Sequence, residues 1–227
     1  SLIKDSGQAS PKIILLSRRK FWTLWFLSRE LWKNPIDLLF VPAHVIPLIT
    51  PQKVLFTPHG VEGVSAPKAY SLFSRLHQRF FLWLAKIKGT AFIAVSKTVK
   101  ADLMKFFNIP ESSITVIYHG YDSAPSPAEP KKPFVEGAYI LSIGRLEVRK
   151  NQLRLVKAFE SIAPEFLALR LVLVGSDGYG ADRIKAAIKA SPCGERIVLA
   201  GYHDREVVLD LLRNARVLAY PSLVEGF

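Results

Sequence analysis

Short apolar runs of strand length alternate with segments of helical periodicity along most of the chain. The runs are rich in β-branched and aromatic residues and end at glycine, proline or polar positions, which is typical of buried strands. They predict strands at residues 36–41, 53–57, 90–95, 114–117, 139–143, 169–174, 196–199 and 217–220. Between them, helical spacing of apolar residues predicts helices at 67–88, 97–107, 151–162, 181–190 and 204–212, with Ser96 and Asp204 as N-caps. Repeated strand–helix alternation predicts an α/β protein with parallel sheets.

A proline-rich stretch interrupts this alternation once. Residues 123–133 contain four prolines in eleven positions, a composition that excludes a helix interior and a central strand. We therefore interpret it as a semi-rigid linker. It divides the chain into a first domain at 1–122, a linker at 123–136 and a second domain at 137–227.

Positive charge is concentrated in the first domain. The formal net charge is +12, of which residues 1–128 carry +9, and the stretch from Gly63 to Ala101 contains seven basic residues and no acidic one. Such a field favours anionic partners: nucleic acid, anionic lipid or phosphorylated substrates. No zinc-finger, homeodomain or RNA-recognition signature is visible, so we expect no nucleic-acid partner and keep a basic nucleic-acid-binding protein as the weakest alternative.

Cysteine content and hydropathy further restrict the class of protein to which the chain can belong. The single cysteine, Cys193, excludes a disulfide framework and a multi-cysteine zinc site, and it fits a reducing, cytoplasmic setting. No apolar run approaches the ~20 residues that a membrane-spanning helix needs.

An aromatic stretch follows a basic cluster near the start of the chain. Arg18, Arg19 and Lys20 directly precede Phe21, and aromatic and leucine residues then recur up to Trp32. Cations beside aromatics are typical of a helix that lies in a membrane interface. The alternative is that these aromatics pack in the core of the first domain, which is the commoner use of such residues.

Candidate ligand-binding residues follow several of the predicted strands. In "IGRLEVRKN", a strand ends at Gly144, and Arg145, Arg149 and Lys150 precede the next helix. Cations at this edge of a parallel sheet, beside a helix N-terminus, favour a phosphate site, although a basic surface loop is the alternative. The segment "LVLVGSDGYG" matches neither the dinucleotide-binding fingerprint nor the P-loop.

Two further polar residues, like the cations above, follow predicted strands. His59 follows the strand at 53–57, where a polar contact to a substrate competes with a purely structural role. Glu225 follows the last predicted strand, where a carboxylate can cap a helix or accept hydrogen bonds from sugar hydroxyls.

The order of these segments resembles the retaining GT-B glycosyltransferases of family 4 (GT4). The resemblance rests on "AVSKTVKADL" and "ITVIYHGYD", the linker, and then "YILSIGRLEVRKNQLRLVKAF", "LVLVGSDG" and "YPSLVEGF". In this family a strand ends in Gly-Arg-Leu followed by Lys-Asn, and Pro-Ser…Glu-Gly-Phe-Gly opens an E-x7-E motif. Glu225 matches the first glutamate of that motif, whose partner would lie beyond Phe227, and the first strand and glycine-rich loop of the family's first domain are missing. We therefore expect the sequence to be a fragment truncated at both ends.

The resemblance implies a fold and an activity. The fold is GT-B, with two Rossmann-like parallel-sheet domains facing across a cleft, both incomplete here. The activity is retaining, metal-independent transfer of a hexose from a donor such as GDP- or UDP-hexose to a glycan or lipid-linked acceptor, with no cofactor. It implies work in polysaccharide or glycolipid assembly, in the cytoplasm, on the inner face of the membrane. The alternative within this fold is an inactive module that binds a sugar nucleotide or a partner. A separate alternative is that the whole protein is active and this fragment of it is not.

Roles for individual residues also follow from the resemblance. Arg145 and Lys150 match the cations that hold the donor diphosphate, beside Gly144. Glu225 matches the contact to the donor sugar, and His59 matches the histidine that approaches the transferred sugar. Gly201 and Tyr202 match the loop with which members of the family contact the nucleotide base. No metal ligand is implied.

Overall fold

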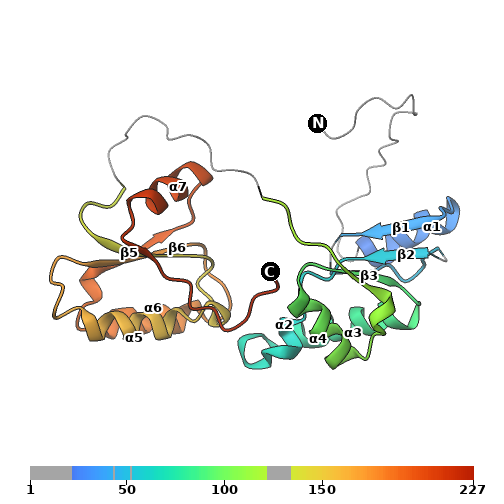
Figure 1. Ribbon diagram of the computed structural model, residues 1–227, viewed down its shortest axis with the longest axis horizontal. Helices are drawn as coiled ribbons and strands as arrows, with labels where there is room; N and C mark the ends of the chain where they lie inside the picture. The colour runs from blue at the N-terminus through green and yellow to red at the C-terminus, as the bar shows by residue number, and fades with distance from the viewer. Residues whose placement is uncertain (1–21, 43, 52, 122–133) are drawn as a thin grey trace.

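A computed structural model describes residues 22–42, 44–51, 53–121 and 134–227. The chain forms two α/β units, each built around a four-stranded parallel sheet (Figure 1). The β-strands are β1 Leu38–Val41, β2 Lys53–Phe56, β3 Ala91–Ala94, β4 Ile114–Val116, β5 Tyr139–Ile143, β6 Arg170–Val174, β7 Ile197–Gly201 and β8 Val217–Leu218. The α-helices are α1 Ser28–Lys33, α2 Glu62–Ser65, α3 Leu72–Ile87, α4 Lys97–Phe107, α5 Gln152–Ile162, α6 Ala181–Ala190 and α7 Arg205–Asn214. Single π or 3₁₀ turns lie at Thr23–Leu27, Pro67–Ala69, Glu111–Ser113, Val148–Lys150 and Gly194–Arg196.

The first sheet has the order β1-β2-β3-β4, with every pair parallel. Helices α2, α3 and α4 lie on one side of it (Figure 1). Its core is built around fully buried residues of β2, β3 and α4, among them Phe56, Phe92 and Leu103.

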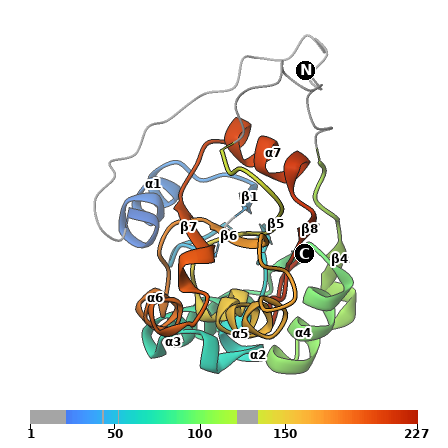
Figure 2. The same ribbon diagram turned by 90° about the vertical axis from the view of Figure 1, so that its left-hand side faces the viewer.

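The second sheet has the order β7-β6-β5-β8 and is covered on both faces. Helices α5 and α6 lie on one face and α7 on the other (Figure 2). Because side chains alternate along a strand, Leu171 and Leu173 of β6 pack in one core cluster, and Val172 and Val174 pack in the other. The prediction of an α/β protein with parallel sheets is confirmed.

Helix beginnings differ in detail from the sequence-based expectations. Ser96 caps α4 as predicted, accepting a hydrogen bond from the Val99 amide at 3.2 Å. The helix predicted from residue 67 begins at Leu72, because Pro67–Ala69 forms a 3₁₀ turn, the backbone is extended at Tyr70, and the Ser71 hydroxyl accepts from the Ser74 amide. Asp204 occupies the N-cap position of α7 without a side-chain capping bond.

The aromatic stretch near the start of the chain is half exposed. Leu24 and Leu31 face inward, but Trp22, Trp25 and Trp32 are exposed. Core packing, the alternative that we judged commoner, is therefore wrong for these three tryptophans. The basic cluster at residues 18–20 and the linker residues 123–133 lie outside the described residues, and Val135 packs in the core of the second sheet. Among the described residues, no helix has both the length and the apolarity of a membrane span.

Candidate functional site

Three neighbouring strands of the second sheet end in glycines with positive φ. Gly144 follows β5, Gly175 follows β6 and Gly201 ends β7, with φ of +137°, +146° and +75°. The Gly144 amide donates to the Val174 carbonyl at 2.8 Å, and the Gly175 amide donates to the Gly201 carbonyl at 2.7 Å. A Cβ at Gly175 would lie closer to the Gly144 carbonyl oxygen than real Cβ contacts allow. These glycines therefore bring three backbones together at the carboxyl edge, where open α/β sheets bind ligands.

Two of the predicted cations lie on the loop that leaves this edge. The Lys150 side chain passes over Gly144, since a Cβ built there would be 3.3 Å from its Cε atom. Its Nζ atom donates to Glu225 Oε1 and to the Tyr220 hydroxyl, both at 2.6 Å. Arg145 is exposed, and its guanidinium donates to the Asp177 carbonyl at 3.0 Å, so it lies against the neighbouring βα loop.

A buried glutamine fixes the shape of this loop. Gln152, at the first position of α5, is 2% exposed. Its Nε2 atom donates to the Arg145 carbonyl at 2.9 Å, and its Oε1 atom accepts from the Glu147 amide at 3.4 Å. Sequence reasoning did not identify Gln152, because a polar residue at a helix start is ordinarily a surface residue.

Arg149 and Lys150 together hold Glu225. Arg149 donates to Glu225 Oε2 at 2.5 Å and, through its other nitrogens, to Glu147 Oε1 at 2.8 and 3.2 Å. Partial burial acts to raise the pKa of Glu225, but the hydrogen bond from Lys150 and the charges of Arg149 and Lys150 outweigh it and keep this pKa below its ordinary value. Glu225 is therefore an ionised carboxylate with a cation at each oxygen.

The segment that carries Glu225 reaches the first domain. It leaves β8 and runs to Phe227 beside α2 and α4 (Figure 1). The Ser96 hydroxyl donates to the Gly226 carbonyl at 2.7 Å, and Gly226 packs so closely on the His59 carbonyl that a Cβ there would collide with it. The segment thus brings Glu225 next to the end of β2.

His59 belongs to a group of three histidines at the carboxyl edge of the first sheet. His44 follows β1, His59 follows β2 and His119 follows β4. His59 Nε2 lies 2.8 Å from the Pro42 carbonyl, His59 Nδ1 lies 3.4 Å from His119 Nε2, and the His44 and His59 rings meet edge to face at 5.5 Å. Burial, with the charges of His59 and His77, lowers the pKa of His44. Across the described residues, no three His, Cys, Asp or Glu side chains are arranged to hold a metal ion.

Glu62, at the start of α2, adds a carboxyl group at the contact between the Glu225 segment and the first unit. Burial raises its pKa, and the charge of Glu225 adds to the rise, whereas a bond to its own backbone amide and the charge of Arg149 oppose it. Because the folded-state pKa exceeds the unfolded one, the folded protein loses stability as pH rises from below the unfolded pKa through the folded pKa.

We therefore expect Glu62→Gln to stabilise the protein at pH 7.5 and to have almost no effect at pH 4, where Glu62 is largely protonated in both states. Urea unfolding of both proteins at the two pH values measures this, with the exposed Glu165→Gln as the control. An equal change at both pH values would contradict the assignment.

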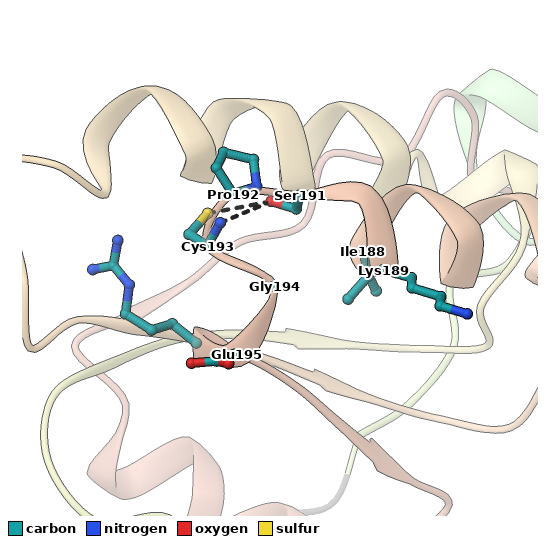
Figure 3. Close-up of a pocket in the computed structure, with 8 residues that line it drawn as sticks. Ile188, Lys189, Ser191, Pro192, Cys193, Gly194 and Glu195 are labelled. Atoms are coloured by element: carbon teal, nitrogen blue, oxygen red, sulfur yellow. Dashed lines mark hydrogen bonds between the residues drawn. The ribbon is translucent and has the colours of Figure 1, made fainter.

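A surface pocket lies at the opposite end of the second domain. It is formed where α6 ends and β7 begins, at the amino ends of the strands (Figure 3). Cys193 is buried there, with its Sγ atom 3.3 Å from the Ser191 hydroxyl. None of the predicted site residues lines this pocket. Its lining residues are Ile188, Lys189, Ser191, Pro192, Cys193, Gly194, Glu195 and Arg196.

The structure thus brings some of the predicted site residues into one region and leaves others outside it. Gly144, Lys150, Glu225 and His59 lie in one contiguous region between the two units. Arg145 is on the same loop, and Gly201 and Tyr202 lie at the end of β7, with residue Tyr202 75% exposed. Their functional roles stay predictions.

Two protein-family models match the chain, one over each unit. The model described as "Glycosyltransferase Family 4" matches residues 6–124, and the model described as "Glycosyl transferases group 1" matches residues 127–227.

Curated relatives with assigned activities are similar over most of the chain. O-antigen chain mannosyltransferase B of Escherichia coli is 30% identical over 223 residues, which are 94% of this chain and 56% of that protein. The N-acetylgalactosamine-N,N'-diacetylbacillosaminyl-diphospho-undecaprenol 4-alpha-N-acetylgalactosaminyltransferase of Campylobacter jejuni is 26% identical over 156 residues, 68% of this chain and 41% of that protein. The chain spans about half the length of the curated relatives it matches.

Solved structures share the fold. WaaG, described as a glycosyltransferase involved in lipopolysaccharide biosynthesis, superposes with a TM-score of 0.67 at 15% identity, covering 88% of this chain and 57% of that one. HepE of Anabaena, in complex with UDP and glucose, superposes with a TM-score of 0.62 at 17% identity, covering 87% and 56%.

Proposed function

The chain belongs to glycosyltransferase family 4, and from this membership we propose that the protein transfers a hexose from a nucleoside-diphosphate sugar to a glycan or lipid-linked acceptor. The observation that carries the proposal is the Lys150–Glu225 ion pair above the glycine edge of the second sheet, with Arg145 on the same loop. Lys150 and Glu225 are in direct contact, and the residue after Glu225 packs on the His59 carbonyl of the first unit, which supports the proposal.

The proposed chemistry follows from the charges. As the bond between the sugar and the diphosphate breaks, the leaving diphosphate gains negative charge, which Arg145, Lys150 and the N-terminal end of α5 would stabilise. These two cations supply the charge that a divalent metal would otherwise bring, so we propose a metal-independent reaction that needs no cofactor. Retention of configuration is proposed from the family resemblance alone.

Glu225 would orient the donor sugar. Its oxygens each accept a hydrogen bond from a cation and remain able to accept further bonds from sugar hydroxyls. His59, held by the Pro42 carbonyl and the His119 ring, would approach the same sugar from the first unit. Gly201 and Tyr202, at the end of β7, would face the nucleotide base, with the exposed Tyr202 ring available for stacking.

The relatives indicate the classes of donor and acceptor to test. One is a mannosyltransferase of O-antigen chains, another acts on a diphospho-undecaprenol glycan, and HepE was crystallised with UDP. We therefore propose a GDP- or UDP-hexose donor and a lipid-linked or glycan acceptor, handled in the cytoplasm at the inner face of the membrane. The proposal assigns no role to nucleic acid.

Nucleotide binding tests the proposal directly. We expect UDP or GDP to bind, and Arg145→Ala/Lys150→Ala to weaken that binding by at least about tenfold, because hydrogen bonds to charged groups contribute roughly 1.5–3 kcal/mol each. Isothermal titration calorimetry with each nucleotide measures the affinities. Lys157→Ala/Lys189→Ala, which removes the same charge from exposed positions of α5 and α6, is the matched control.

Two results would count against this assignment. Tight binding that Arg145→Ala/Lys150→Ala leaves unchanged would place the donor elsewhere. If neither nucleotide bound to the folded protein, an inactive, partner-binding module of the same fold would become the better description.

A further inference from the structure

Helix α3 is apolar on two opposite faces. Phe81, Leu82, Leu84 and Ala85 are buried in the core of the first unit. Six further large apolar side chains of the same helix are exposed, with Phe73 77% and Trp83 52% accessible. At 3.6 residues per turn, these six fall within a sector of about 100° that points away from the buried face. We call them the α3 stripe: Leu72, Phe73, Leu76, Phe80, Trp83 and Ile87.

Basic side chains border the α3 stripe. Arg75, Arg79 and Lys86 lie along one edge of it, at spacings of four and seven residues that keep them in line on a helix. The stretch from residue 63 to residue 101 contains no acidic residue, so no carboxylate of this stretch neutralises them. The stripe and its border therefore form an apolar band beside a positive one.

Two more exposed apolar side chains lie on a loop that contacts the end of α3. Lys88 Nζ donates to the Leu48 carbonyl at 2.7 Å, and the Ile49 amide donates to the Ser28 hydroxyl at 3.2 Å, so the loop at 48–50 joins the end of α3 to α1. Leu48 and Ile49 are exposed. Scattered apolar side chains are ordinary on a protein surface, but a contiguous band of this kind marks an interaction site.

We propose that the α3 stripe docks on the surface of an anionic lipid bilayer, with α3 lying in the membrane plane. Tryptophan and phenylalanine suit the interface between headgroups and acyl chains, and the arginines and lysine beside them match anionic headgroups. This charge complementarity favours a bilayer over a second copy of the chain, whose own stripe would bring the same cations into repulsion.

Docking through α3 would also position the candidate site. Gln78, on the same helix, donates to the Gly60 carbonyl at 3.0 Å and accepts from the Gly63 amide at 2.9 Å. These bonds tie α3 to the loop that follows His59. The site would then stand at a fixed distance from the bilayer, which suits a lipid-linked acceptor; this consequence rests on the proposed function, whereas the docking itself does not.

Vesicle sedimentation tests the docking. We expect the protein to sediment with vesicles of phosphatidylcholine and phosphatidylglycerol, and to stay in solution with phosphatidylcholine alone. Phe80→Gln/Trp83→Gln is expected to weaken binding by at least ~10-fold through lost apolar burial. Arg79→Gln/Lys86→Gln is expected to weaken it by about tenfold through lost attraction, an effect that salt reduces.

Matched variants separate docking from general effects. Phe166→Gln removes an exposed aromatic of the second unit, and Lys157→Gln/Lys189→Gln removes two exposed charges there; both should bind vesicles like the unmodified protein. The stripe variants should keep their melting temperature and their affinity for nucleotide, so a failure of docking is distinguishable from a failure of the proposed function.

Three outcomes would overturn the inference. They are absence of vesicle binding, equal binding to neutral and anionic vesicles, and loss of binding in the control variants. Self-association measured by light scattering and abolished by Phe80→Gln/Trp83→Gln, without vesicle binding, would instead assign the stripe to an interface between copies.

Discussion

Glu225→Gln is expected to lower the turnover of the donor by about 10²- to 10³-fold while leaving the affinity for nucleoside diphosphate equal or higher. The reason is the position of the carboxylate between Arg149 and Lys150, which hold its two oxygens. Neutralising Glu225 frees Lys150 for the diphosphate but removes the charged acceptor that we propose for the sugar hydroxyls. The affinity for nucleoside diphosphate should therefore stay equal or rise while the turnover of the donor falls.

Hydrolysis of the donor, in which water takes the place of the acceptor and yields free sugar and nucleoside diphosphate, measures this turnover. Lys150→Ala is the informative comparison, because it should weaken nucleotide binding and turnover together. Glu225→Asp keeps the charge and should recover part of the turnover. If Glu225→Gln lost affinity and turnover in equal proportion to Lys150→Ala, the carboxylate would be acting only through the loop that it holds.

Gly175→Ala is expected to destabilise the second unit by more than ~3 kcal/mol. Gly175 has a φ of +146°, and its Cβ would overlap the carbonyl of Gly144 and approach the Arg145 amide. Because both neighbours are backbone atoms of the adjacent strand end, no side chain can rotate to make room. The strands β5 and β6 would have to separate at the edge where the ligand is proposed to bind.

Gly201→Ala provides the matched substitution. Gly201 has a φ of +75°, but a Cβ there would meet no atom within 4 Å. Conformational strain alone should then cost about 1–2 kcal/mol. Urea unfolding monitored by circular dichroism compares the two variants. Equal losses would mean that strain rather than the approach of the two strand ends makes Gly175 necessary.

The strands and the parallel sheets could be predicted because each strand is a short apolar run between turn residues. β5 and β6, for example, lie within the predicted ranges and are buried on both faces. The start of α3 was predicted too early, since apolar periodicity extends through Pro67–Tyr70 although the backbone there is not α-helical. The exposure of Trp25 and Trp32 could not be read from periodicity, because it depends on which neighbouring elements cover them.

For the candidate site, the sequence identified residues more readily than their partners. Arg149 was visible as a cation, but its bond to Glu225 joins residues 76 positions apart and required the fold. The histidine group carried an unused signal. His44, His59 and His119 each follow a parallel strand, and the carboxyl ends of such strands meet at one edge.

The segment from Tyr220 to Phe227 links side chains of the candidate site to the contact between the two units. Its carboxylate is held by Arg149 and Lys150 of the second unit, while the next residue is held by Ser96 of the first. A ligand that competes for Lys150 therefore acts on a contact between the units, and a change in the arrangement of the units acts on the affinity of that ligand. By thermodynamic linkage the two effects have the same free energy, so we expect occupancy of the proposed donor site to be coupled to the arrangement of the two units.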